Sequence, residues 1–215
     1  MSLVIADYKV LAHSCIKIIY ENGLVVYFDP FHVTENYGDA DLVFVTHDHY
    51  DHMSPEDISK VCKDTTKIIL PKAFVSNACG MGFASDKVIG LLPKEETEVD
   101  GLKITAVPSY NVGKDFHPKS DCYLGYNVTL DGVSVFVAGD TDMNEDNKDI
   151  KCDYAFIPCG GTYTMNAKEA AEFANVLKPS VAVPTHYGDI VGTLEDGKTF
   201  VSLVDPSINA IERLV

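Results

Sequence analysis

Four candidate metal ligands fall within six residues of this sequence. The segment THDHYDH at residues 46–52 supplies His47, His49, Asp51 and His52. Residues two apart on an extended chain point to the same side, so His47 and His49 can hold one metal ion together. Where the chain turns, Asp51 and His52 can bind a second ion beside it. Imidazole and carboxylate ligands suit zinc, iron or manganese, and so many groups that are costly to desolvate need a common reason to converge.

The residues that flank this segment predict a loop between a strand and a helix. The run DLVFVT at residues 41–46 is short and mostly apolar, as expected of a buried strand. After the segment, Ser54 is suited to cap a helix that begins at Pro55 and carries acidic residues in its first turn. The metal-binding residues therefore follow directly from a strand of the core.

The rest of the chain predicts a mixed α/β fold. Asn22-Gly23 and Asp131-Gly132 favour tight hairpin turns, and Asn166 with Glu169 forms a capping-box pattern at the start of a helix. We expect each half to be a sheet with helices on one side, and the two halves to form a four-layer αββα sandwich in a single domain, residues 1–215. The remaining strand-like runs are residues 15–20, 24–28, 67–70, 87–92, 102–107, 122–130, 133–138, 153–158 and 181–184.

Composition limits the classes of function. The 215 residues are 46% hydrophobic, which suits a large buried core, and no apolar run approaches the roughly 18 residues of a membrane span. The first residues lack the pattern of a signal peptide, so we expect a cytoplasmic protein. The 32 acidic and 17 basic side chains give a formal charge of −15, which argues against a nucleic acid partner. Six cysteines without a CxxC pair predict neither disulfides nor a thiolate metal site.

The segment THDHYDH resembles the HxHxDH signature of the metallo-β-lactamase superfamily. In that superfamily a third histidine, an aspartate in a Gly-Asp pair and a last histidine follow in this order. The matching positions are His117 in KDFHPK, Asp140 in VAGDTD and His186 in VPTHYG. The resemblance runs from about Asp29, in YFDP, to His186, and so covers most of the chain.

This resemblance implies two divalent metal ions, zinc first, with manganese and iron as alternatives. His47, His49 and His117 would bind one ion, Asp51, His52 and His186 the other, and Asp140 would bridge them. A hydroxide shared by the two ions would attack the substrate, so that no side-chain nucleophile is needed. Asp51 and Asp140 are thus the expected catalytic residues, with Asp51 as proton acceptor. Asp29 would orient the histidine loop from behind the ligands.

Several residues are candidates for substrate contacts. Lys114 and Lys119 lie in the loop at residues 108–119 and could meet an anionic group, although solvated lysines are the alternative. Tyr110 could stack or hydrogen-bond, and Tyr187 follows His186. THxHYDH, KxFHPK and GGxxTM resemble the branch that includes L-ascorbate-6-phosphate lactonase and N-acyl-phosphatidylethanolamine phospholipase D. The resemblance implies a small-molecule, anionic substrate: an ester, lactone or phosphodiester.

Other interpretations remain open at the level of sequence. A non-hydrolytic metal-binding protein, either a sensor or an interaction protein with a vestigial site, is the main alternative. A flavodiiron-type redox site is disfavoured because His49 stands where those proteins have Glu. His13, which ends a strand-like run, could line the pocket or be a capping or surface residue, and His32 lies in a loop. The oligomeric state is open, a homo-oligomer included.

Overall fold

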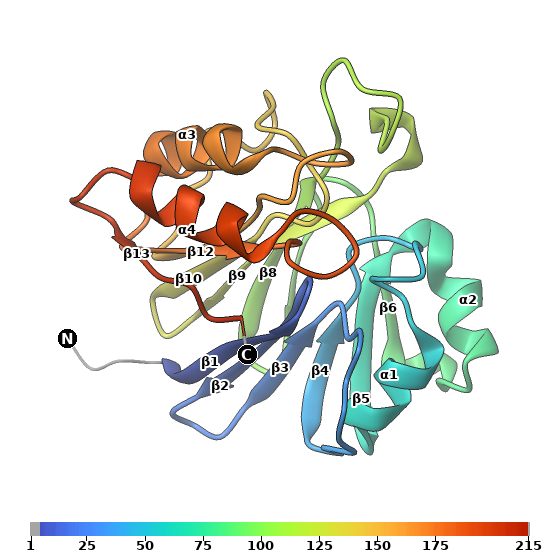
Figure 1. The fold of residues 1–215 in the computed structure, drawn as a ribbon. Helices are drawn as coiled ribbons and strands as arrows, with labels where there is room; N and C mark the ends of the chain where they lie inside the picture. The colour runs from blue at the N-terminus through green and yellow to red at the C-terminus, as the bar shows by residue number, and fades with distance from the viewer. Residues whose placement is uncertain (1–4, 215) are drawn as a thin grey trace. The chain divides into compact units, whose positions relative to one another are not determined.

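The computed structural model describes residues 5–214 of the chain. This part of the chain forms two compact units, of which the first comprises residues 5–92 with Leu214 and the second residues 93–213. Each unit contains one β-sheet. In Figure 1 the first unit runs from blue into green, and the second continues from green to red.

The sheet of the first unit has six strands in the order β1-β2-β3-β4-β5-β6. The first three strands pair antiparallel, and β3 to β6 pair parallel. The turn between β2 and β3 has Gly23 at φ +87°, which explains the glycine of the predicted Asn-Gly hairpin. The strands are β1 (Ile5–Ala12), β2 (Cys15–Tyr20), β3 (Val25–Phe28), β4 (Ala40–Phe44), β5 (Cys62–Pro71) and β6 (Val88–Leu91).

Two helices pack against this sheet (Figure 1). Helix α1 (Pro55–Val61) begins as predicted, because the Ser54 hydroxyl accepts a hydrogen bond from the Asp57 amide and proline occupies the first turn. Helix α2 (Val75–Gly80) follows the short 3₁₀ turn η1 (Lys72–Phe74), and a second such turn, η2 (Ser85–Lys87), precedes β6. The core under the helices combines residues of α1 and α2 with sheet residues, among them Tyr27, Val43, Val45, Ile58, Val61, Ile68, Leu70 and Ala78.

The second unit has a seven-stranded sheet in the order β13-β12-β11-β10-β9-β8-β7. Its strands β7 to β10 pair antiparallel, and β10 to β13 pair parallel. Parallel pairing places the ends of β10, β11 and β12 at one edge of the sheet. The elements are β7 (Glu96–Val99), β8 (Leu102–Pro108), η3 (Lys119–Asp121), β9 (Leu124–Leu130), β10 (Val133–Val137), β11 (Tyr154–Pro158), β12 (Val181–Thr185) and β13 (Asn209–Ala210).

Helices α3 (Ala167–Leu177) and α4 (Leu194–Leu203) lie against this second sheet and against each other (Figure 1). The predicted capping box is present at the start of α3. The Asn166 side chain accepts a hydrogen bond from the Glu169 amide, and the Glu169 carboxylate accepts one from the Asn166 amide. The Phe173 ring of α3 packs edge-on to Phe136 of β10, with the ring centres 6.3 Å apart. These contacts cover one face of the sheet with apolar side chains.

The mixed α/β class is confirmed, with two sheets and four α-helices in residues 5–214. The stacking of four layers and the single domain concern the placement of one unit against the other, and they stay predictions. Strands β7 and β13 and helices α2 and α4 were not expected from the sequence. Among the described residues, no helix combines the length and apolar character needed to cross a bilayer.

Candidate metal centre

The histidine segment is positioned by two neighbouring parallel strands. β3 pairs with β4 so that Phe28 lies opposite Phe44, and the chain continues to Asp29 after β3 and to Thr46 after β4. The Asp29 carboxylate accepts hydrogen bonds from the Thr46 amide (2.8 Å) and from the Thr46 hydroxyl (2.7 Å). Asp29 therefore fixes the backbone just before His47.

The same carboxylate also holds His52. Asp29 Oδ2 lies 2.7 Å from His52 Nδ1, and both side chains are buried. A carboxylate beside Nδ1 keeps the proton on that nitrogen and leaves Nε2 with its lone pair for a metal ion. Asp29 thus contacts both the start of the histidine segment, at Thr46, and its end, at His52.

His47 and His49 present their ring nitrogens to each other. His47 Nε2 lies 3.1 Å from His49 Nδ1, and the ring centres are 4.5 Å apart. The His47 ring is buried, whereas His49 is exposed, and the Thr46 hydroxyl lies 2.9 Å from His47 Nδ1. Two imidazole nitrogens at this distance are spaced as ligands of one metal ion.

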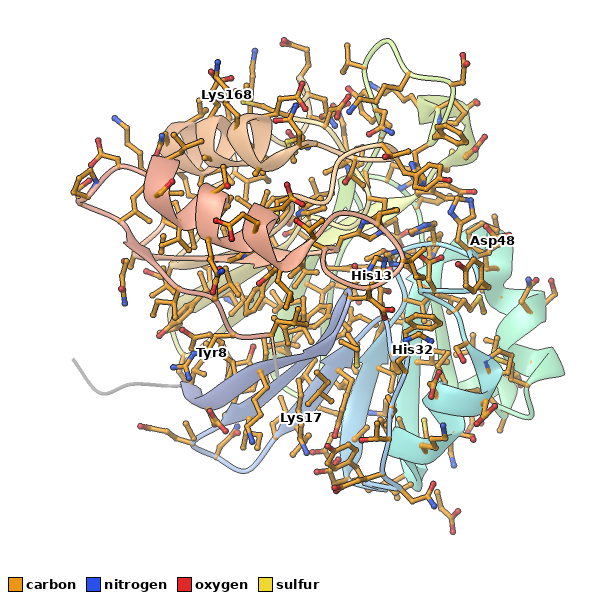
Figure 2. All side chains as sticks on the ribbon, in the orientation of Figure 1. Tyr8, His13, Lys17, His32, Asp48 and Lys168 are labelled. Carbon is orange, nitrogen blue, oxygen red and sulfur yellow. The ribbon has the colours of Figure 1, made fainter. Side chains whose placement is uncertain are left out.

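Asp51 lies between two imidazoles of its own unit. Its Oδ2 is 3.5 Å from His52 Nε2 and 3.3 Å from Nε2 of His13, a residue outside the predicted ligand set. His13 is completely buried in the turn between β1 and β2, where Figure 2 labels it. The role of His13 could not be decided from the sequence, because His13 reaches Asp51 only through the pairing of β1 with β2.

The second unit holds three candidate ligands of its own. Asp140 follows β10 and His186 follows β12, so both lie at the edge where the parallel strands end. Asp140 Oδ2 lies 3.0 Å from His186 Nε2 and 3.6 Å from His117 Nε2. One carboxylate oxygen therefore faces both imidazoles, and all three side chains are buried.

His117 owes its position to Asn111. The Asn111 amide donates to the His117 carbonyl oxygen (2.9 Å), and the Asn111 side chain donates to the Tyr163 carbonyl oxygen (2.6 Å). The same carbonyl oxygen lies 3.2 Å from His117 Nδ1, so a proton on Nδ1 leaves Nε2 directed at Asp140. Asn111 was not identified from the sequence, because nothing except its place in the same loop indicates that it contacts His117.

The donor chemistry of both units fits divalent metal ions. Buried imidazoles and carboxylates lie together in each unit, and the second ring nitrogen faces Asp29 at His52 and a backbone oxygen at His117. The six cysteines are free thiols, and burial raises the pKa of the Cys15 thiol to about 12. The donor set therefore suits zinc, iron or manganese rather than a softer metal.

The lysines of the 108–119 loop each meet a carboxylate of the second unit. Lys114 Nζ donates to Asp142 and to the Thr164 carbonyl oxygen. Lys119 Nζ lies 2.6 Å from Asp146 Oδ2 and 4.7 Å from the centre of the Tyr110 ring. The structure brings Tyr110 and Lys119 together, but it places both lysines in ion pairs that offset their charge.

Tyr187 lies under helix α4. The side chain is buried, and a Cβ atom added to Gly197 of α4 would come within 2.5 Å of the tyrosine ring. Burial raises the pKa of the Tyr187 hydroxyl, so the phenol stays neutral across the physiological range. In this position the ring fills space beneath the helix.

His32 is set apart from the candidate ligands. It is exposed in the loop after β3, where its ring stacks on Phe31 with the centres 3.8 Å apart (Figure 2). Its backbone amide donates to Asp57 of α1 at 3.1 Å. The structure therefore uses the His32 backbone to anchor the loop.

Comparison with known proteins defines the class. A family model for the β-lactamase superfamily domain matches residues 8–186. The chain belongs to the metallo-β-lactamase superfamily, and it is a metal-dependent hydrolase. It is 31% identical over 216 residues to a UPF0173 metal-dependent hydrolase of Thermococcus onnurineus, a match that covers 94% of each chain.

Solved structures show the same fold. A candidate metal-dependent hydrolase from Parabacteroides distasonis is 31% identical and has a TM-score of 0.81, with 97% of this chain and 93% of that chain covered. CmlA, a diiron β-hydroxylase from Streptomyces venezuelae, has a TM-score of 0.75 at 16% identity, with 96% of this chain and 52% of that chain covered. The fold alone therefore does not fix the metal or the reaction.

Proposed function

We propose that the chain is a dinuclear hydrolase of a small ester, lactone or phosphodiester. The observation that carries this proposal is the position of Asp140 Oδ2, which faces His186 Nε2 at 3.0 Å and His117 Nε2 at 3.6 Å. A carboxylate oxygen directed at two imidazoles is suited to link two metal ions. The first unit also supports two metal ions, because its candidate ligands form one pair at His47 and His49 and another at Asp51 and His52.

In the proposed centre Asp140 would be the ligand shared by the two ions. Two divalent ions supply, when bound, a nucleophile derived from water near neutral pH and a Lewis acid for the scissile carbonyl or phosphoryl oxygen. We assign His47, His49 and His117 to one ion, and Asp51, His52 and His186 to the other.

The side chains of the chain itself have three tasks in this proposal. Asp29 and Thr46 hold the histidine segment in place through their short hydrogen bonds. Asp51 would accept the proton that leaves the attacking water, because its carboxylate lies beside His52 in the proposed centre. All of the assigned ligands except His49 are buried, which removes competing water and strengthens the effect of the charged ligands on the reacting group.

The substrate we propose is small, and its class rests on the resemblance to the lactonase and phospholipase branch. Lys114 and Lys119 remain the proposed contacts for an anionic group, with Tyr110 beside them. Each lysine must then share its charge with Asp142 or Asp146, which limits the affinity that it can add. We infer a cytoplasmic location from the six free cysteines, because thiols persist in reducing compartments.

Metal content and turnover together test this function. The protein is reconstituted separately with zinc, manganese and iron, and its metal content is measured by elemental analysis before a panel of esters, lactones and phosphodiesters is assayed. We expect about two ions per chain and turnover of at least one panel member that a chelator abolishes. Two bound ions without any turnover would favour the sensor or vestigial-site alternative.

A matched pair of variants serves as control. Asp140→Asn removes the proposed bridging charge, whereas Asp131→Asn makes the same chemical change in the exposed β9–β10 turn. We expect the first variant to lose at least one metal ion and most activity, and the second to resemble the wild type. Equal behaviour of the two variants would contradict the dinuclear centre.

A further inference from the structure

We propose that His13 is a metal ligand on the same side of the centre as Asp51 and His52. The inference rests on the proposed metal-dependent function and adds a ligand that the HxHxDH segment does not contain. His13 lies in the same unit as Asp51 and His52, and all three residues are buried. Figure 2 labels His13 in the turn that follows β1.

The spacing of the donor atoms matches that of ligands around one ion. His13 Nε2 lies 3.3 Å from Asp51 Oδ2, and His52 Nε2 lies 3.5 Å from the same oxygen. The donor atoms of the three residues are all within 4.8 Å of one another. With metal–ligand bonds of about 2.0–2.1 Å, ligand atoms that are neighbours around one ion lie roughly 3–3.5 Å apart.

The distance between His13 and Asp51 differs from that of a histidine–aspartate hydrogen bond in the same unit. His52 Nδ1 lies 2.7 Å from Asp29 Oδ2, which is the length of a charge-assisted hydrogen bond between an imidazole and a carboxylate. The 3.3 Å between His13 and Asp51 is clearly longer. This distance is therefore the spacing of two ligands that share an ion, rather than that of a carboxylate that orients a ring.

The backbone at His13 supports a functional reason for the imidazole. Ala12 pairs with Cys15, so His13 and Ser14 form a two-residue loop between β1 and β2. His13 has φ +47°, in the left-handed region that favours Gly or Asn in hairpin loops of this length. A histidine here costs free energy relative to glycine, and strained residues of this kind concentrate at functional sites.

The surroundings of the ring are suited to a ligand. The Phe31 and His52 rings both lie edge-on to His13, with centres 6.2 Å away. Phe31 presents apolar surface that keeps bulk water from the imidazole, and the Phe31 ring also contacts the exposed His32 and Tyr50 rings. A dry position beside a carboxylate strengthens the attraction for a cation.

Metal binding by a matched pair of variants tests the inference. His13→Asn removes the imidazole but keeps a residue that tolerates positive φ, and His32→Asn makes the same change at φ +49° in the same unit. We expect the wild type and His32→Asn to bind about two zinc ions per chain. His13→Asn should lose one ion or bind it at least tenfold more weakly in chelator competition.

A spectroscopic readout separates a ligand from a residue that merely positions Asp51. In the cobalt-loaded protein, each coordinated histidine with a protonated ring nitrogen gives one paramagnetically shifted N–H resonance. At cobalt concentrations high enough to fill both sites in each variant, we expect His13→Asn to lack one such resonance and His32→Asn to lack none. An unchanged number of shifted resonances in His13→Asn would overturn the inference, even if zinc affinity fell.

Folding controls keep the outcomes distinct. The unfolding temperature of each metal-free variant is compared with that of the wild type, and His13→Gly, which suits the turn better, replaces His13→Asn if the latter does not fold. A wild type that binds no metal would contradict the proposed function. A wild type that binds two ions, together with a His13 variant that binds two ions equally tightly, would contradict only the role of His13.

Discussion

Asp29 Oδ2 lies 2.7 Å from His52 Nδ1, and both side chains are completely or almost completely buried. The two residues follow neighbouring parallel strands, because Asp29 comes directly after β3 and the segment with His52 comes after β4. Asp29 has φ +46°, and its amide donates to the Phe44 carbonyl oxygen, so its backbone is held as firmly as its carboxylate. One carboxylate thereby fixes both the start of the histidine segment, at Thr46, and its end.

The first prediction follows from this relationship. Asp29→Asn keeps the size of the side chain and tolerates the positive φ, but it weakens the hold on the His52 ring. We expect the affinity for zinc to fall by about 10–100-fold, the usual effect of removing a partner that orients a metal ligand. Competition with a chromophoric chelator measures this change.

Asp39→Asn is the matched control for that variant. Asp39 belongs to the same unit and accepts hydrogen bonds from Lys17 (2.6 Å) and the Tyr27 hydroxyl (2.9 Å). None of these three residues is a candidate metal ligand, so zinc affinity should be unchanged. If Asp29→Asn bound zinc as tightly as Asp39→Asn does, Asp29 would be a structural residue only.

The second prediction compares two ligands of the second unit. A bridging carboxylate contributes to both metal sites, whereas His117 contributes to one. Asp140→Ala should therefore lower the number of bound ions more than His117→Ala, measured by elemental analysis after dialysis. Asp131→Ala, in the exposed β9–β10 turn, should retain the wild-type content. Full occupancy in Asp140→Ala would mean that this aspartate does not bridge.

Local signals in the sequence explain what could be predicted. Ser54 and Asn166 cap helices because their side chains reach backbone amides two or three residues away, so the start of each helix is encoded nearby. The dense histidine segment is likewise recognised from the spacing of its own residues, although Asp29 of another strand holds it in place. The helix starts and the candidate ligands of this segment could therefore be named from the sequence alone.

Long-range pairing explains what could not be predicted. The contact of His13 with Asp51 requires that β1 pair with β2 in one register and that the sheet continue to β4. Helix α4 was missed because Gly197 lies in its interior and only Gly197 and Phe200 are buried, which leaves a weak helical pattern. The carboxylate partners of Lys114 and Lys119 lie about thirty residues away in the sequence and give no local sign.

The third prediction concerns the packing of Tyr187 under α4. A Cβ atom at Gly197 would lie 2.5 Å from the Tyr187 ring, so Gly197→Ala overpacks a buried site. Alanine gains about 0.5–1 kcal/mol of helix propensity, but relief of the clash costs about 1–3 kcal/mol. We expect a net loss of about 1–2 kcal/mol in the free energy of unfolding, measured by urea denaturation.

Gly80→Ala is the control for the packing effect. Gly80 ends α2, and a Cβ atom added there meets nothing within 4 Å, so this variant should be neutral or slightly more stable. Adding Tyr187→Leu to Gly197→Ala should restore part of the lost stability, because the smaller side chain vacates the space. A stable Gly197→Ala would show that the ring can move away without cost.

The last prediction is a dependence of stability on pH that originates at Asp146. Its carboxylate accepts from Lys119, contacts Lys94 at 2.7 Å and accepts from the Tyr110 hydroxyl at 3.0 Å, and its side chain is only 8% exposed. The hydrogen bond from Lys119, followed by that from Lys94, holds the pKa of Asp146 well below its usual range. Since the pKa is lower in the folded state, the stabilisation is complete above the unfolded value near pH 4 and is lost as the pH falls towards the folded value.

Asp146→Asn should accordingly lower the unfolding temperature by about 2–4 °C at pH 7, a modest shift because Lys94 and Lys119 are 70% and 62% exposed and solvent screens their pairs. The difference from the wild type should shrink between pH 4 and pH 2.5, where Asp146 takes up a proton in the unfolded wild type while the folded carboxylate stays charged. Glu145→Gln, which removes the exposed pair with Lys148, should leave the unfolding temperature almost unchanged at every pH. A loss in Asp146→Asn that is equally large at pH 7 and pH 2.5 would show that Asp146 stabilises the protein through packing or neutral hydrogen bonds, because only a charged carboxylate gives a contribution that fades with acid.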